Sequence, residues 1–172
     1  VTLDPAASTL SGTMNVTFVN DSGVELNEVY FRLYPNIDYY GDGALAISEV
    51  IVGGEAAASG FEVNDSALRV DLPDPLPDGE TAEIMLSFTT TVPVNSAGSY
   101  GIFSHETSTG TWILADWHPV LAVYEPDHGW YLDPATPAGD PTHAASSYFD
   151  VTITAPDDLT VVTSGTVVEA RS

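Results

Sequence analysis

The side chains that could do chemistry concentrate between Tyr100 and Trp130. This stretch holds all three tryptophans and three of the four histidines, and its Trp117-His118-Pro119 corner follows an aspartate. A histidine beside carboxylates can bind a metal, exchange a proton or accept a hydrogen bond from a cation. Each of these chemistries requires its own arrangement of residues.

The first candidate is a zinc site at His105 and Glu106, which open the pattern HExxH. That pattern works because two histidines one helical turn apart bind the same zinc while the glutamate activates water. Here the second histidine position is Thr109, and Gly110 and β-branched neighbours disfavour a helix. We therefore predict a polar loop and no zinc at this pair.

A second metal site could be built from the acidic residues and histidines that follow. Their spacings match no standard ligand pattern: His118, His128, His143, Asp116, Glu125, Asp127, Asp133 and Asp140. Calcium, which takes six or more oxygen ligands, could lie among Asp127, Asp133 and Asp140, but a solvated loop is favoured. No metal ligand and no cofactor site is predicted within these residues.

Nucleophilic catalysis is not predicted. Ser104, His105 and Glu106 are consecutive, and consecutive residues of a strand point to opposite faces, so they cannot pass a proton along a line. We therefore assign no catalytic residue to the chain and expect it to be inert as a catalyst by itself.

Aromatic side chains offer a different function, the stacking of sugars. The candidates are Tyr39, Tyr40, Trp117 and Trp130. Aromatic residues at strand spacing more often belong to a core, and that interpretation is favoured. The sugar-stacking platform remains the best feature of an alternative function, a carbohydrate-binding module.

Charge restricts the partners of this chain. Its 172 residues include 25 acidic residues against three arginines and no lysine, for a formal net charge of -22. Nucleic acid and anionic membranes are therefore improbable partners, because both are bound through basic residues. An acidic surface stays hydrated in salt or outside the cell, so an extracellular or cell-surface location is favoured. Calcium or a cationic partner are the alternatives.

The same composition bears on domain organisation. The absence of cysteine excludes disulfides and thiolate zinc sites, and no apolar run approaches the roughly 20 residues that span a bilayer. The first residues, Val1-Thr2-Leu3, follow no signal-peptide pattern. We expect a single domain over residues 1–172, excised from a longer protein.

Alternation of apolar and polar residues predicts an all-β fold, a sandwich of antiparallel sheets. Residues 14–19 and 24–34 are expected to pair as a hairpin, and residues 81–92, the longest clean strand, to be central. Proline-rich residues 73–79 are expected to be a fixed connection, and residues 125–142 a long loop. Further strands are predicted at residues 47–52, 61–63, 68–72, 100–103, 111–116, 148–155 and 160–163.

The order of several segments resembles the opening of the alanyl aminopeptidase family of HExxH zinc metallopeptidases. The resemblance covers nearly the whole chain. It rests on Leu10-Ser11-Gly12, Asn20 and Ser22, LNEVYFRLYPN (26–36), LPDPLPDG (72–79), FTTTVP (88–93), YGIF (100–103), Trp117-His118-Pro119 and Gly129-Trp130.

This resemblance implies a saddle-like N-terminal β domain that packs on a downstream catalytic domain. In the family, that partner domain alone holds the zinc and the HExxH motif, and the β domain contributes a polar Gln or Glu that binds the α-amino group of the peptide. Matching that segment places Trp117 on the aromatic position, His118 on the amine-binding position and Asp116 just before it.

His118 departs from the family pattern. A neutral imidazole accepts a hydrogen bond from an ammonium group, whereas a protonated one repels it, so either Asp116 takes this role or His118 has another. The resemblance implies a non-catalytic wall of an aminopeptidase substrate cleft, in an enzyme that is itself zinc-dependent. A stand-alone extracellular carbohydrate- or calcium-binding sandwich is the alternative.

Overall fold

The computed structural model describes residues 1–38, 41–96, 102–134 and 142–170. Its strands are β1 (Thr2–Asp4), β2 (Thr9–Val19), β3 (Leu26–Arg32), β4 (Ala44–Val52), β5 (Glu55–Ala56), β6 (Ser59–Glu62), β7 (Ala67–Leu76), β8 (Thr81–Thr91), β9 (Phe103–Glu106), β10 (Thr111–Leu114), β11 (Val120–Leu121), β12 (Tyr124–Glu125) and β13 (Gly129–Trp130), with one 3-10 turn, η1 (Tyr34–Asn36). None of the helices in the described ranges is long and apolar enough to cross a bilayer.

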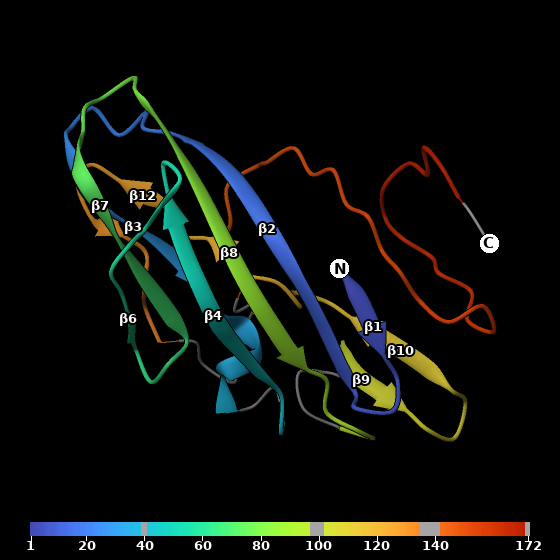
Figure 1. Cartoon of the computed structure of the whole chain (residues 1–172). Coiled ribbons are helices and arrows are strands. Elements are labelled where there is room, and N and C mark those ends of the chain that lie inside the picture. The colour runs from blue at the N-terminus through green and yellow to red at the C-terminus, as the bar shows by residue number, and fades with distance from the viewer. Residues whose placement is uncertain (39–40, 97–101, 135–141, 171–172) are drawn as a thin grey trace.

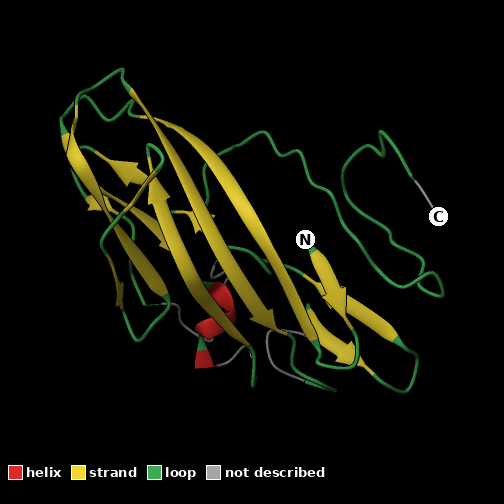
Figure 2. Ribbon diagram, viewed as in Figure 1, coloured by secondary structure: helices red, strands yellow, loops and turns green. Residues whose placement is uncertain are grey.

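Two antiparallel sheets make up the body of the domain. The larger sheet has the strand order β1-β2-β8-β4-β5, and the smaller has the order β11-β3-β7-β6. Two short hairpins, β9–β10 and β12–β13, complete the described fold. The long, twisted ribbons of β2, β8 and β4 run side by side in Figure 1, with β3, β6 and β7 toward one side of them, and Figure 2 shows how little helix the fold contains.

The main core lies between the inward faces of these sheets. The larger sheet contributes Phe18, Leu45, Val50, Val52, Ala82, Ile84, Leu86 and Phe88, and the smaller contributes Leu26, Val29, Phe31, Leu33, Leu68 and Val70. The alternation of these residues with exposed ones along β2 and β8 is the pattern of strands buried on one face. The predicted all-β sandwich of antiparallel sheets is confirmed.

The central position of β8 is confirmed as well. It pairs along its whole length with β2 on one side and with most of β4 on the other. Its inward residues Ala82, Ile84, Leu86 and Phe88 are all buried. A long alternating strand buries the most apolar area when it has neighbours on both edges.

The predicted hairpin of the first two long strands is wrong. β2 pairs with β1 and β8, whereas β3 belongs to the other sheet and pairs with β7 and β11. The turn after β2 connects the two sheets, and Asn20 within it is fully buried. Its Nδ2 donates to the carbonyls of Val24 and Leu76 at 2.7 and 2.8 Å. Asn20 thus ties the turn to the end of β7.

Two further predictions need correction. The proline-rich residues 73–76 belong to β7, where a register shift between Leu26 and Glu28 lets the ladder skip from Asp71 to Leu76. A bulge of this kind accommodates Pro73 and Pro75, which have no N–H to donate. Residues 148–155 and 160–163 form no strand, because only Thr154 makes a bridge, to the edge strand β1 at Thr2.

Candidate functional site

The segment from Asp116 to His118 links the β9–β10 hairpin to the edge of the smaller sheet. β10 ends at Leu114 and β11 begins at Val120, which pairs with Arg32 of β3. Trp117 fixes the segment, because its indole packs on Phe88 with ring centroids 6.0 Å apart and its carbonyl accepts a hydrogen bond of 2.7 Å from Thr90 Oγ1. Thr90 is fully buried, so this bond anchors the segment to the central strand.

Asp116 lies in this segment and has an unusual backbone conformation. Its φ of +51° is in the left-handed region, which non-glycine residues seldom occupy, although aspartate tolerates it better than most. Thr142 Oγ1 donates to its Oδ2 at 2.8 Å, and the side chain is half-buried. The carboxylate is therefore held in one orientation at the end of a strand.

His118 has a defined hydrogen-bonding state on one side of its ring. Its Nδ1 lies 2.8 Å from the carbonyl oxygen of Pro119, and because a carbonyl can only accept, Nδ1 carries a proton. The ring also contacts Trp117, edge to face at 5.0 Å, and Phe149 at 5.5 Å. In the neutral imidazole Nε2 is then left with the lone pair that can accept a hydrogen bond.

The pair His105 and Glu106 lies in strand β9, not in the loop we expected. Adjacent strand residues diverge, so the helical spacing that HExxH requires does not arise here. His105 stacks on Trp112 of β10 at 3.8 Å, while Ser104 Oγ donates to Glu106 Oε1 at 2.7 Å. The Ser104 hydroxyl therefore donates its hydrogen bond to the Glu106 carboxylate and not to the His105 imidazole.

The alternative sites gain no support from the geometry. No group of three or more histidine and acidic side chains with metal-binding geometry occurs in the described ranges. Asp127 and Asp133 are exposed, and Asp140 lies outside the described residues. Trp117 and Trp130 pack against the main core instead of forming an open platform, while Tyr39 and Tyr40 lie outside the described ranges.

The predicted loop over residues 125–142 contains a hairpin that packs against Tyr30 of β3 and Phe18 of β2. β12 and β13 pair through Tyr124 and Trp130, and Trp130 packs on Tyr30 at 5.8 Å. Beyond the hairpin, the carbonyls of Tyr131 and Asp133 accept hydrogen bonds from Arg32. We call residues 129–133 the cover segment.

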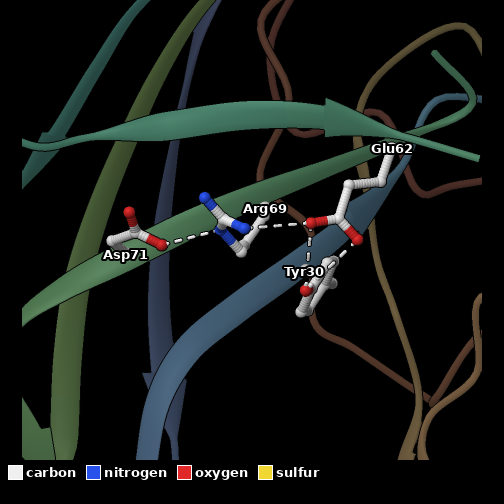
Figure 3. Close-up of polar contacts among 4 residues, drawn as sticks. All are labelled: Tyr30, Glu62, Arg69 and Asp71. Atoms are coloured by element: carbon white, nitrogen blue, oxygen red, sulfur yellow. Dashed lines mark hydrogen bonds and ion pairs between the residues drawn. The ribbon is translucent and has the colours of Figure 1, made fainter.

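A charged network lies around Tyr30 on the smaller sheet (Figure 3). Arg69 of β7 lies between two carboxylates, with Nη1 3.1 Å from Glu62 and Nε 2.8 Å from Asp71. The bond with Asp71 raises the pKa of Arg69 further above its ordinary value. Tyr30 completes the network, because its hydroxyl donates to both oxygens of Glu62 at 3.4 Å.

Tyr30 makes the stability of this face depend on pH. Burial, followed by the negative charge of Glu62, raises its pKa above the ordinary value of about 10. The folded state therefore holds the phenol proton more tightly than the unfolded state, and this contribution, present below roughly pH 10, is lost as the pH rises toward the folded pKa.

We therefore expect the free energy of unfolding to fall more steeply from roughly pH 9 to 11 in the wild type than in Tyr30→Phe. Urea unfolding at a series of pH values measures both slopes. Tyr131, whose pKa is raised by its hydrogen bond to Glu125, is present in both proteins and cancels in the comparison. Equal slopes would show that the Tyr30 proton is not linked to folding.

Similarity to known proteins was found among solved structures. No protein-family model matches the chain, and no curated protein matches it either. Among solved structures, it is similar to an M1 zinc metallopeptidase from Deinococcus radiodurans, at 22% identity and a TM-score of 0.42 over 55% of this chain and 19% of that one.

Two further solved structures are similar at the same level. One is a mutant two-domain M1 zinc metallopeptidase bound to L-arginine, at 22% identity and a TM-score of 0.42 over 56% of this chain and 19% of that one. The other is a mutant of the Deinococcus radiodurans enzyme bound to a Tyr-Ser-Ala substrate, at 21% identity and a TM-score of 0.43, over 69% of this chain and 27% of that one.

All three of these structures are of M1 zinc metallopeptidases. The chain spans 19 to 27% of the length of these matched chains. The alignments therefore cover only a part of each of these proteins.

Proposed function

We propose that this chain is the non-catalytic N-terminal β domain of a zinc metallo-aminopeptidase and forms one wall of its substrate cleft. The resemblance of the sequence in order and spacing, together with the two-sheet fold, supports this role. In the parent enzyme the zinc would belong to the downstream catalytic domain, the partner of this chain. Zinc would supply the activated water there, and this chain would supply binding groups for the peptide.

The observation that carries the proposal is the conformation of Asp116. A left-handed aspartate at a strand end, with one carboxylate oxygen bonded to Thr142, is held in a backbone state that costs energy. Strained polar residues of this kind cluster at binding sites. A carboxylate held in this way has the charge and lone pairs to accept hydrogen bonds from a peptide α-ammonium group.

The charge of the domain favours the same ligand. With 25 acidic residues against three arginines, the surface potential attracts a cationic peptide terminus more than the neutral amide inside a longer chain. His118 would assist through Nε2 in its neutral form. Trp117, anchored by Thr90, would form the apolar wall next to these two polar groups.

The proposal is tested in the full-length enzyme with Asp116→Asn. Loss of a charge-assisted hydrogen bond, worth about 1.5–3 kcal/mol, should raise the Michaelis constant for aminoacyl substrates by roughly tenfold or more. Asp21→Asn is the matched control, because Asp21 is exposed on a distant turn and its loss changes the net charge equally. Equal kinetics in the wild type and Asp116→Asn would remove the proposed role.

A further inference from the structure

Arg32 is a buried cation whose hydrogen-bonding capacity is only partly used. Its side chain emerges from the outer face of β3, and the residue is 5% exposed. Nη1 donates to the carbonyls of Asp133 at 3.1 Å and Tyr131 at 3.4 Å, and the guanidinium lies 5.6 Å from the centre of the Tyr34 ring. Nε and Nη2 are buried and donate to no acceptor.

The contrast with Arg69 makes this arrangement unusual. Arg69 lies on the neighbouring strand β7, its side chain is 40% exposed, and it pairs with two carboxylates (Figure 3). Arg32 is far more buried and has no ion pair within the described residues. Burying an uncompensated charge is costly, and a chain with 25 acidic residues does not lack carboxylates to compensate it.

The unused atoms are arranged for one kind of ligand. The N–H groups of Nε and Nη2 point the same way along one edge of the planar guanidinium, and this edge takes two oxygens of a carboxylate in parallel hydrogen bonds. Nη1, which is occupied by the two carbonyls, is not needed for that geometry. The two unpartnered donors therefore have the orientation that a bidentate carboxylate contact requires.

The surroundings of Arg32 concentrate the unsatisfied donors of the domain. Within the described ranges, the buried side-chain polar atoms without a partner are Nε and Nη2 of Arg32 and Nε1 of Trp130. Trp130 belongs to the cover segment and packs on Tyr30, two residues before Arg32 on the same face of β3. All three unsatisfied donors thus belong to β3 and the segment that covers it.

The cover segment is held to Arg32 by weak acceptors. The two carbonyls are neutral, and the bond to Tyr131 is long for an N–H donor. A carboxylate at the vacant edge would make two charge-assisted bonds, which are about twice as strong as neutral ones. Because these donor atoms are buried, a ligand would reach them only after the cover segment moves, which favours a small ligand.

We propose that Arg32 anchors a binding site for a small monocarboxylate between β3 and the cover segment. The ligand binds through both oxygens to Nε and Nη2, while Nη1 keeps its bond to the Asp133 carbonyl. This site uses neither Asp116 nor His118 and does not depend on the proposed role in an aminopeptidase.

Formate is the probe, and the Nε–H signals of arginine in nitrogen-15 correlation spectra are the readout. The chain has three arginines, so Arg32→Lys and Arg69→Lys assign the signals by their disappearance. Titration of sodium formate into the full chain should move the Arg32 signal downfield in a saturable manner. The Arg69 signal should stay in place, because its Nε is already bonded to Asp71.

Sodium chloride at matched ionic strength separates carboxylate binding from a general anion effect. A saturable shift with formate and none with chloride supports the site. An unmoved Arg32 signal, or equal shifts with both salts, overturns it. Arg32→Met supplies a second readout. Formate should raise the melting temperature of the wild type above its value in chloride, and the melting temperature of Arg32→Met should be the same in both salts.

Discussion

Phe31→Ala should lower the free energy of unfolding by about 3–5 kcal/mol. Phe31 is completely buried on the inward face of β3, within the core between the two sheets. Removing its ring forfeits the transfer of the aromatic side chain from water and leaves a cavity between the layers, which rigid paired strands cannot close. Urea unfolding followed by circular dichroism measures the loss.

The control for this prediction is Phe61→Ala. Phe61 lies on the edge strand β6 and is 48% exposed, so the same substitution should cost no more than about 1 kcal/mol. The dependence of the free energy on urea concentration should stay the same in both variants, because the fold is retained. Comparable losses at the two positions would contradict the assignment of the core to the space between the sheets.

Asn36→Ala should have the second-largest effect, a loss of about 3 kcal/mol. Asn36 ends η1, and its side chain bonds both backbone groups of Leu45: Oδ1 accepts from the N–H at 2.5 Å, and Nδ2 donates to the carbonyl at 3.0 Å. Nδ2 also donates to the carbonyl of Asp65 at 2.8 Å. This one amide ties η1 to β4 and to the turn before β7.

The cost of Asn36→Ala comes from the groups that are left behind. Leu45 is buried, and the loss of its side-chain partner leaves backbone donor and acceptor unsatisfied, at about 1–3 kcal/mol for each group. Asn15→Ala on the exposed face of β2 is the matched control and should cost little. Equal effects at Asn15 and Asn36 in thermal unfolding would show that the Asn36 amide is not a structural tie.

Local patterns in the sequence predict the layers of this fold well. The alternation in β8 indicates one buried face, and the structure gives that face to Ala82, Ile84, Leu86 and Phe88. A period of two specifies which side of a strand is apolar, but it carries no information about the neighbouring strand. The sequence pattern therefore predicts that β2 and β3 pair with each other, although they lie in different sheets.

The same limit explains the error at the C-terminal end. Residues 148–155 alternate like a strand, but a strand also requires an edge to pair with. In the structure the backbone of Thr154 bonds to Val1 and Leu3, and no ladder continues from this bridge. Tyr148 and Phe149 consequently remain exposed.

The candidate site shows a similar division between pattern and tertiary structure. The residues Asp116, Trp117 and His118 are candidates because their segment resembles that of a known family. Their tertiary partners Thr142, Thr90 and Phe149 do not, because these come from distant parts of the chain. The sequence alone does not single out Arg32, although an apolar strand that carries one of the chain's three arginines is a signal that sequence can supply.

The substrate preference of the full-length enzyme tests most directly whether this domain forms a wall that recognises a free amino terminus. The measurement is the ratio of kcat/KM for a short peptide over that for its N-acetylated form, in the wild type and in Asp116→Asn. We expect a strong preference for the free amine in the wild type and a preference reduced roughly tenfold in the variant. A wild type that cleaves both peptides equally, or a ratio that Asp116→Asn leaves unchanged, would contradict the account.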